Sequence, residues 1–138
     1  MLYKIGVDLG GTKTEIIVLD ENLNVLERKR VPTPQNNYNE IIHTIETLVS
    51  DVSQNISDFS LGICCPGSIS KQTGLIKNSN TRCLIGKSLK KDLEHKLHKT
   101  ISIENDANCF TLSESKMGAG IGFGLVFGVI LGTGVGGG

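Results

Sequence analysis

One short stretch near the start of the chain carries the side chains and turn glycines that phosphate chemistry needs. In DLGGTKT the carboxylate of Asp8 precedes a Gly10-Gly11-Thr12 turn, and Lys13 follows. Glycines let backbone N–H groups point into one concavity, which suits phosphate oxygens. Thr12 adds a hydroxyl, Lys13 adds a cation, and Asp8 can hold Mg2+ directly or through water because hard cations take oxygen ligands. A plain hairpin turn has the same composition, so these residues alone leave both interpretations open.

The ENDAN segment, from Glu104 to Asn108, places carboxylate and amide groups where a strand pattern gives way to a helix pattern. Ligands of open α/β sheets bind off the carboxyl ends of strands. Asp106 at such a position can accept a proton from a substrate hydroxyl. Asn105 or Asp106 can equally be the N-cap of the helix, and one residue can do both. The residues alone favour the cap without excluding a function.

Two other glycine and asparagine signals are less specific. The Pro66-Gly67 turn and the KNSN segment, residues 77–80, could bind sugar hydroxyls, although loops are rich in these residue types in any case. Gly132, Gly134 and Gly137 fit G-x-G-x-x-G after a strand pattern. A dinucleotide site also needs a following helix and a later acidic residue, and neither follows in the sequence.

The uncharged stretch from Met117 to Gly138 has glycines four residues apart, as on the face of a membrane helix. Its strongly apolar part, Leu125 to Leu131, is only as long as a strand, and no basic anchor follows it. A strand buried on both faces also has a continuous apolar run. We therefore expect no membrane span, but a buried strand over Phe123 to Leu131 that leads into a glycine turn.

Hydrophobic periodicity predicts the elements that position these residues. We expect an α/β fold, with a mixed sheet that starts as an antiparallel β-β-β meander and has helices on both faces. The expected strands are 3–9, 15–20, 23–31, 59–65, 101–104 and 123–131, and the expected helices are 38–52, 88–98 and 105–117, with a long polar loop over 68–87.

Length and composition set limits on the class of protein. The 138 residues suit one domain, and 14 Lys+Arg balance 14 Asp+Glu, so nothing in the charge favours a nucleic acid or an anionic membrane as partner. The four cysteines form no CxxC and no His pair has zinc spacing, so we expect no zinc site. The N-terminus lacks the apolar run of a signal peptide, which predicts a cytoplasmic protein with reduced thiols.

Five motifs, taken in order, resemble the ROK sugar kinases: IGVDLGGTKTEIIVLD, VPTP, GICCPGSIS, ENDANCFTLSE and ILGTGVGGG. The resemblance covers essentially all 138 residues. It implies the actin-like ATPase (ribonuclease H-like) fold that this family shares with hexokinases and actin. PGSIS with TGLIKNSN is most similar to the bacterial ROK fructokinases, whereas NDANCF and ILGTGVGGG are equally similar to the bacterial N-acetylglucosamine kinases.

The resemblance also implies a reaction, in which the γ-phosphate of ATP passes to a hexose hydroxyl, the primary one. Fructose is the first expected substrate, followed by N-acetylglucosamine and then glucose or mannose. Asp106 matches the catalytic base of the family. The ATP-phosphate and Mg2+ positions map to Asp8, Gly10, Gly11, Thr12, Lys13, Gly132, Thr133 and Gly134, and the sugar positions to Gly67, Asn80, Asn105 and Asp106.

The same resemblance divides the chain into two parts. Residues 1–118 match a first lobe, and residues 119–138 match the opening strand and phosphate loop of a second lobe. In the family that second lobe supplies the adenine pocket, further sugar ligands and often a Cys/His zinc site, so we expect residues 1–138 alone to be inactive. We expect the terminal glycines to be mobile, or ordered only by a neighbouring copy. The full-length protein is expected to be a homodimer.

Two other function classes stay open. A ROK transcription repressor carries a DNA-binding helix-turn-helix before its sugar domain, whereas here Met1 lies directly before the first predicted strand. A non-catalytic, sugar-responsive regulator is the third class. The intact DLGGT and NDAN motifs favour the kinase, because a protein that only binds sugar has little need for a base.

Overall fold

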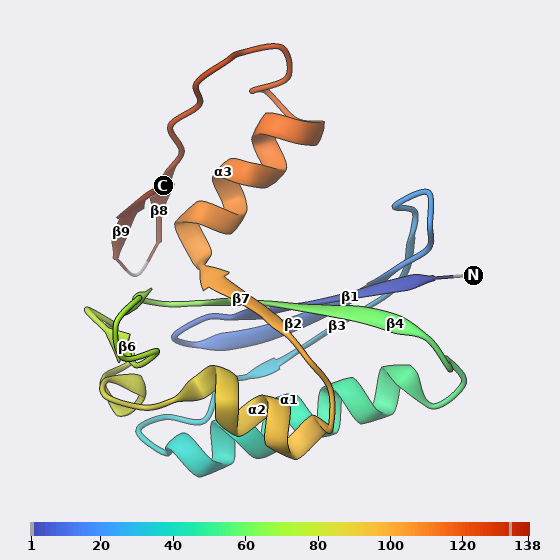
Figure 1. Ribbon diagram of the computed structural model, residues 1–138, viewed down its shortest axis with the longest axis vertical. Helices are drawn as coiled ribbons and strands as arrows, with labels where there is room; N and C mark the ends of the chain where they lie inside the picture. Colours follow the sequence, from blue (N-terminus) through green and yellow to red (C-terminus); the bar gives the residue numbers. More distant parts are fainter. Residues whose placement is uncertain (1, 133) are drawn as a thin grey trace.

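A five-stranded mixed sheet forms the centre of the computed structural model, which describes residues 2–132 and 134–138. The strand order is β3-β2-β1-β4-β7 (Figure 1). β1, β2 and β3 pair antiparallel, and β4 then pairs parallel to β1 and to β7. This confirms the α/β class and the antiparallel opening. The strands are β1 (Tyr3–Leu9), β2 (Lys13–Leu19), β3 (Val25–Pro32), β4 (Phe59–Cys65) and β7 (Ser102–Asn105).

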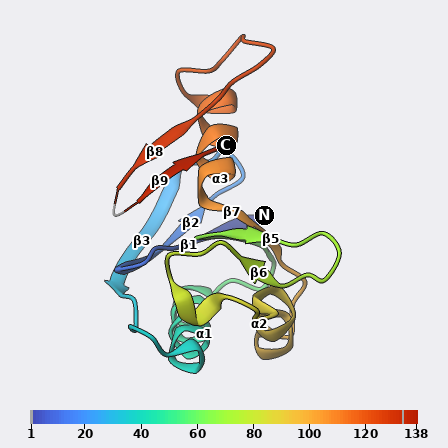
Figure 2. The same cartoon turned by 90° about the vertical axis from the view of Figure 1, so that its left-hand side faces the viewer.

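The hydrophobic core lies between one face of this sheet and two helices, α1 (Tyr38–Ser53) and α2 (Leu89–Leu97) (Figures 1 and 2). Alternate strand residues such as Val7 and Ile16 point into it because successive side chains of a strand face opposite sides. α1 begins at the predicted cap, where the Asn37 side chain accepts a hydrogen bond from the Glu40 N–H at 3.2 Å. The buried stripe of α1 comprises Ile41, Ile42, Ile45, Leu48, Val49 and Val52.

The other face of the sheet carries α3 (Asp106–Met117), so helices lie on both faces as predicted (Figure 1). Asn105 caps α3 and the helix ends at Gly118. α3 rises from the end of β7 and leaves much of this face uncovered (Figure 1). On this face, β1 and β4 contribute Gly6 and Gly62, which are register partners. One face is therefore a helix-packed core, and the other is an open surface with α3 at one end.

The segment predicted as a long polar loop, residues 68–87, contains regular structure. β5 (Ser68–Ile69) pairs antiparallel with β6 (Ile76–Lys77), and a 3-10 helix, η1 (Arg82–Leu84), follows. Ile76 and Leu84 are both buried in the core. The expected loop is wrong here because two isolated apolar side chains, too few to show a period, anchor the segment through tertiary packing.

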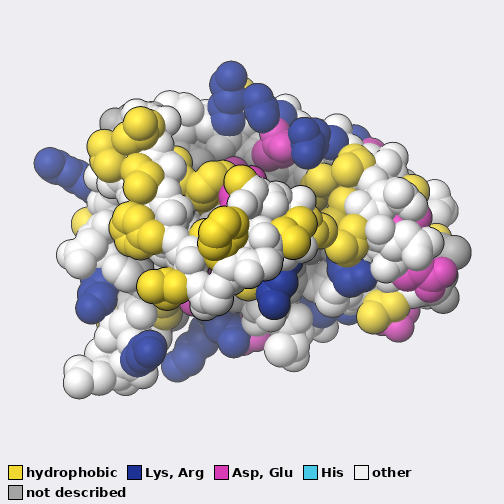
Figure 3. All heavy atoms as spheres, turned by 90° about the horizontal axis from the view of Figure 1, so that it is seen from above, with side chains coloured by type: hydrophobic (Ala, Val, Ile, Leu, Met, Phe, Trp, Pro, Cys, Tyr) yellow, Lys and Arg dark blue, Asp and Glu magenta, His cyan; other side chains and the backbone are white. Residues whose placement is uncertain are grey.

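The predicted buried strand over residues 123–131 is also wrong. Only β8 (Val129–Leu131) is a strand, and it pairs antiparallel with β9 (Val135–Gly137) in a separate hairpin. The apolar side chains before it face outward, with Leu125 92% and Phe127 74% exposed, and Figure 3 shows hydrophobic side chains gathered on this side of the molecule. Among the described residues, no helix has the length and apolarity to cross a membrane.

The terminal glycines lie against α3 of the same chain, whereas the expectation was that they would be mobile or ordered only by a neighbouring copy. The Thr111 hydroxyl donates to the Gly138 carbonyl at 3.1 Å. A Cβ on Gly138 would lie 2.6 Å from the backbone N of Asn108, and one on Gly136 would lie 3.4 Å from Ala107 Cβ. At Gly138 the hairpin backbone therefore approaches the first turn of α3 at a distance that only a glycine allows, whereas Gly136 lies at ordinary packing distance.

The turn between β1 and β2 is held from behind by the segment that follows β3. The Thr33 hydroxyl donates to the Gly10 carbonyl at 2.8 Å, and the Thr33 N–H donates to the Thr12 carbonyl at 2.9 Å. Gln35 Nε2 donates to the Gly11 carbonyl at 2.9 Å. Because Thr33 donates its one hydroxyl proton to Gly10, its oxygen accepts from the buried Thr14 hydroxyl at 2.8 Å. The carbonyl side of the turn is thereby fixed.

The two threonines allow a test of this arrangement. Thr33→Val removes the donor to Gly10 and the acceptor for Thr14, and an unpaired buried polar group costs about 1–3 kcal/mol. Thr14→Val leaves the bond from Thr33 to Gly10 intact, so it should cost less. We expect urea unfolding to rank Thr33→Val as the more destabilised variant. An equal or larger loss in Thr14→Val would contradict the assigned direction of the hydrogen bonds.

Gly67 and Gly74 form a second matched pair for stability. Both have positive φ, +92° and +72°, but a Cβ on Gly67 would lie 2.7 Å from the Lys77 carbonyl oxygen, whereas a Cβ on Gly74 meets nothing within 4 Å. Gly74→Ala should cost about 1–2 kcal/mol from backbone strain alone. Gly67→Ala should cost roughly 1–3 kcal/mol more because the neighbouring strand must move. Denaturant midpoints measure both, and equal costs would show that the contact is unimportant.

Candidate functional site

The predicted site residues meet because three parallel strands end at one edge of the sheet. In the register, Asp8 lies beside Cys64 and Cys65 lies beside Asn105. The chain leaves β1 into the glycine turn, β4 into Pro66-Gly67 and β7 into α3. Carboxyl ends of parallel strands are where open α/β sheets bind ligands. The structure thus brings the three predicted motifs to one edge.

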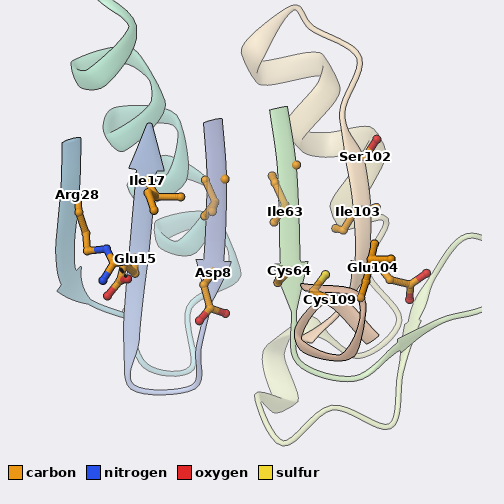
Figure 4. A pocket seen from close by; sticks show the side chains of 14 residues that line it. Asp8, Glu15, Ile17, Arg28, Ile63, Cys64, Ser102, Ile103, Glu104 and Cys109 are labelled. Carbon is orange, nitrogen blue, oxygen red and sulfur yellow. Dashed lines mark ion pairs between the residues drawn. The ribbon is translucent and has the colours of Figure 1, made fainter. Parts of the chain in front are cut away.

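Asp8 lies at this edge, on the open face of the sheet (Figure 4). Partial desolvation raises the pKa of the Asp8 carboxyl above its ordinary value, and the negative charge of Asp106 raises that pKa further. The second effect shows that the two carboxylates are electrostatically close. A cation beside Asp8 would remove both penalties, and a carboxylate oxygen is the ligand type that Mg2+ prefers.

The Gly10-Gly11-Thr12 turn presents backbone N–H groups outward. Its carbonyl oxygens are occupied by Thr33 and Gln35, and the Gly10 N–H donates to the Lys13 carbonyl at 3.0 Å. The N–H groups of Gly11 and Thr12 make no hydrogen bond to other described residues, and the stretch from Gly11 to Lys13 is exposed. A Cβ on Gly10 would lie 2.6 Å from the Lys13 carbonyl oxygen. These features suit a turn that receives an anion.

Asn105 connects two of the predicted sugar positions. Its Oδ1 accepts from the N–H groups of Ala107 at 3.0 Å and Asn108 at 3.3 Å, which is the helix cap predicted from the sequence. Its Nδ2 donates to the Gly67 carbonyl at 2.6 Å. The side chain therefore fixes the Pro66-Gly67 turn against the start of α3, and in this structure it acts as a positioning residue.

Asp106 is the first residue of α3 and is half-buried. Its Oδ1 accepts from the Ala107 N–H at 2.8 Å, at the positive end of the helix dipole. Its Oδ2 has no partner among the described residues. One oxygen is thus held by the helix terminus, while the other is free to accept a proton.

The two predicted phosphate turns lie near one loop. Gly134 packs against the Asn80 side-chain amide so closely that a Cβ there would overlap with it. On the other side, a Cβ on Gly11 would lie 3.6 Å from the Thr81 hydroxyl. The Gly132 N–H donates to the Gly134 carbonyl at 2.9 Å, which closes the second turn, and Thr133 lies outside the described residues.

A pair of thiols beside this edge was not predicted from the sequence. Cys64 and Cys109 line a hollow of about 640 Å3 on the open face of the sheet, together with Gly6, Ile17, Gly62 and Ile103 (Figure 4). A hydrogen bond between the two thiols lowers the pKa of Cys109 and raises that of Cys64. The signal in the sequence was strand alternation in GICCPG, which places adjacent cysteines on opposite faces.

Among the residues that the structure describes, no group of three or more His, Cys, Asp or Glu side chains could hold a metal ion. A divalent cation beside Asp8 would therefore need water or other non-protein oxygen atoms to complete its coordination.

Comparison with known proteins places this geometry in a family. The sequence model of the family described as "ROK family" matches residues 4–138. N-acetyl-D-glucosamine kinase from Pectobacterium atrosepticum is 41% identical over 134 residues, which cover 96% of this chain and 44% of that protein. N-acetylgalactosamine kinase from Shewanella sp. (strain ANA-3) is 37% identical over 134 residues, which cover 96% of this chain and 43% of that protein.

Solved structures agree with the sequence matches. A ROK family glucokinase from Streptomyces griseus, in complex with glucose and AMPPNP, superposes with a TM-score of 0.88 at 31% identity, covering 98% of this chain and 43% of that chain. The likeness confirms the predicted actin-like ATPase fold class. The chain spans less than half the length of the relatives it matches. With the match over residues 4–138, the chain belongs to the ROK family.

Proposed function

We propose that residues 1–118 form the first lobe of an ATP-dependent sugar kinase and that residues 119–138 open its second lobe. The observation that carries the proposal is the free Oδ2 of Asp106, held at the same sheet edge as Asp8 and the Gly10-Gly11-Thr12 turn. A base, a candidate cation ligand and an anion-binding turn are the parts that phosphoryl transfer to an alcohol needs. The named activities of the relatives support the same reaction class.

Asp106 accepts the proton of the attacking sugar hydroxyl through its free carboxylate oxygen. The bond from the Ala107 N–H to the other oxygen fixes the orientation of the carboxylate. Asn105, bonded to the Gly67 carbonyl, holds the Pro66-Gly67 turn beside the base. Most of the rate enhancement in such a site comes from this positioning, because the protein takes no covalent part in the transfer.

The glycine turns bind the phosphate groups in the proposed reaction. The outward N–H groups of Gly11 and Thr12 bind phosphate oxygens, and Lys13 adds a positive charge. The family resemblance assigns the second phosphate turn to Gly132, Thr133 and Gly134, of which the Gly132 N–H already donates to the Gly134 carbonyl. Bound Mg2+ would neutralise charge on the phosphates, with Asp8 as its ligand directly or through water.

The sugar is best assigned from the relatives. The matches at 41% and 37% identity are named as kinases of N-acetylglucosamine and N-acetylgalactosamine. We therefore propose an N-acetylhexosamine as substrate, with glucose second because it is bound in the Streptomyces griseus structure. This order replaces fructose, the first expectation from the PGSIS and TGLIKNSN segments.

The role of Asp106 is tested in a longer chain that joins residues 1–138 to the C-terminal part of the Pectobacterium relative. Asp106→Asn keeps the shape of the side chain but removes the proton acceptor. We expect kcat for N-acetylglucosamine phosphorylation, followed by ADP release, to fall by about 10²–10⁴-fold. The Kd for the sugar, measured by calorimetry, should change little.

Glu104→Gln is the matched control, since Glu104 is an exposed carboxylate two residues before Asp106. The amide oxygen of the new side chain can still accept from the Asn105 N–H, as the Glu104 carboxylate does. We expect this variant to keep its kcat. Retained activity in Asp106→Asn, or an equal loss in both variants, would exclude Asp106 as the specific base.

Asp8 gives a prediction about stability that is separate from catalysis. Its pKa is raised from 3.8 in the folded chain, so its ionised form is less favourable in the folded state than in the unfolded state. The stability it contributes is present below pH 3.8 and is lost as pH rises through its folded pKa. Asp8→Asn, which cannot ionise, should therefore be more stable than the wild type at pH 7 without ligands, and the difference should vanish near pH 3.8.

Asp20→Asn is a control of opposite sign. Hydrogen bonds from Asn24 and Asn22 lower the pKa of Asp20, so its contribution is present above its unfolded pKa and is lost as pH falls. Asp20→Asn should be less stable than the wild type at pH 7. Urea unfolding between pH 4 and pH 7 measures both variants, and a destabilised Asp8→Asn at pH 7 would show that Asp8 stabilises the fold.

A further inference from the structure

Two cysteines on different elements meet on the open face of the sheet. Cys64 is in β4 and points away from the α1–α2 core, and Cys109 lies in the first turn of α3. Figure 4 shows their side chains next to each other, and both line the hollow of about 640 Å3. Both residues are partly exposed. Neither thiol takes part in the proposed phosphoryl transfer.

The other two cysteines are placed differently. Cys65 follows Cys64 in β4, so it points to the opposite face, where it is fully buried in the core. Cys83 lies in η1 and packs against the same core. Of the four cysteines, Cys64 and Cys109 are thus the two that combine mutual contact with access from a hollow.

We propose that Cys64 and Cys109 form a reactive dithiol site that takes hydrogen peroxide as its oxidant and closes to a disulfide between β4 and α3. The neighbouring hollow gives a small oxidant room to reach the sulfur atoms. The two side chains lie beside each other on β4 and α3, so side-chain rotation is the movement that would bring the sulfur atoms to bonding distance. The proposal does not depend on the kinase activity.

The reaction balances with peroxide alone. One sulfur, as thiolate, attacks a peroxide oxygen, the O–O bond breaks, and a sulfenic acid forms with release of one water. The second sulfur attacks the sulfur of the sulfenic acid, and the S–O bond of the sulfenic acid breaks. The departing hydroxide takes up the remaining thiol proton and leaves as a second water. Two thiols and one peroxide give one disulfide and two waters, with two electrons passing from sulfur to oxygen.

The disulfide would tie the first turn of α3 to the sheet. That turn begins with Asp106, three residues before Cys109, and β4 leads directly into Pro66-Gly67. A crosslink between distant positions also limits the freedom of the unfolded chain. We therefore expect the oxidised chain to unfold at a higher urea concentration than the reduced chain.

The experiment uses the chain of residues 1–138. It is treated with hydrogen peroxide, alkylated, digested with trypsin without reductant and analysed by mass spectrometry. Cys64 and Cys65 fall in the tryptic peptide 31–71, Cys109 in 100–116 and Cys83 in 83–87. We expect peptides 31–71 and 100–116 to be joined, lighter than their sum by two hydrogens, and separated again by dithiothreitol. Peptide 83–87 should be alkylated.

Three variants identify which cysteine of peptide 31–71 forms the link to peptide 100–116. Cys64→Ser and Cys109→Ser should each abolish it, whereas Cys83→Ser should keep it. Circular dichroism checks that each variant folds, and the partly exposed Cys109 supplies a second loss-of-link variant should Cys64→Ser fail to fold. A link that persists in Cys64→Ser, a link found only in covalent dimers, or oxidation to sulfinic acid without any link would each overturn the proposal.

Discussion

The parallel pairing of β4 with β1 and β7 is the constraint on which the site depends. Parallel strands end at the same edge of a sheet, so motifs that are far apart in the sequence must meet there. The register brings Asp8 beside Cys64 and Cys65 beside Asn105, and the Asn105 amide then fixes Gly67 against α3. An antiparallel β4 would place its PG turn at the far edge, away from Asp106.

This pairing also forces two acidic groups together. Partial burial at the sheet edge raises the pKa of Asp8, and the negative charge of Asp106 raises it further, so the ionised form of Asp8 is disfavoured there. On the same face, Glu15 instead forms an ion pair with Arg30. A like-charged pair beside an anion-receiving turn is unfavourable until a cation joins it, which is the electrostatic pattern expected of a binding site and not of a stabilising contact.

Sequence patterns predicted those helices and strands whose boundaries are set by residues close together in the chain. The helix capped by Asn37 and the helix capped by Asn105 both begin where polar capping residues precede their helical patterns. The three site motifs could also be placed, because each follows an alternating strand. The β5–β6 hairpin could not, since its two-residue strands depend on Ile76 reaching the core. The contact between Cys64 and Cys109 is likewise a tertiary contact, and no residue spacing in the sequence predicts it.

The C-terminal segment differs for a related reason. Its apolar run predicts burial, yet Phe123, Leu125 and Leu131 are each more than two-thirds exposed. Exposed hydrophobic side chains gathered on one side of a molecule, as Figure 3 shows here, are of the kind that marks a contact with more protein. In a two-lobed kinase, the second lobe would cover it and close the cleft over the substrates. The apolar pattern therefore describes an interface that the proposed second lobe would complete, while the glycines that contact Ala107 and Asn108 already fix one side of it.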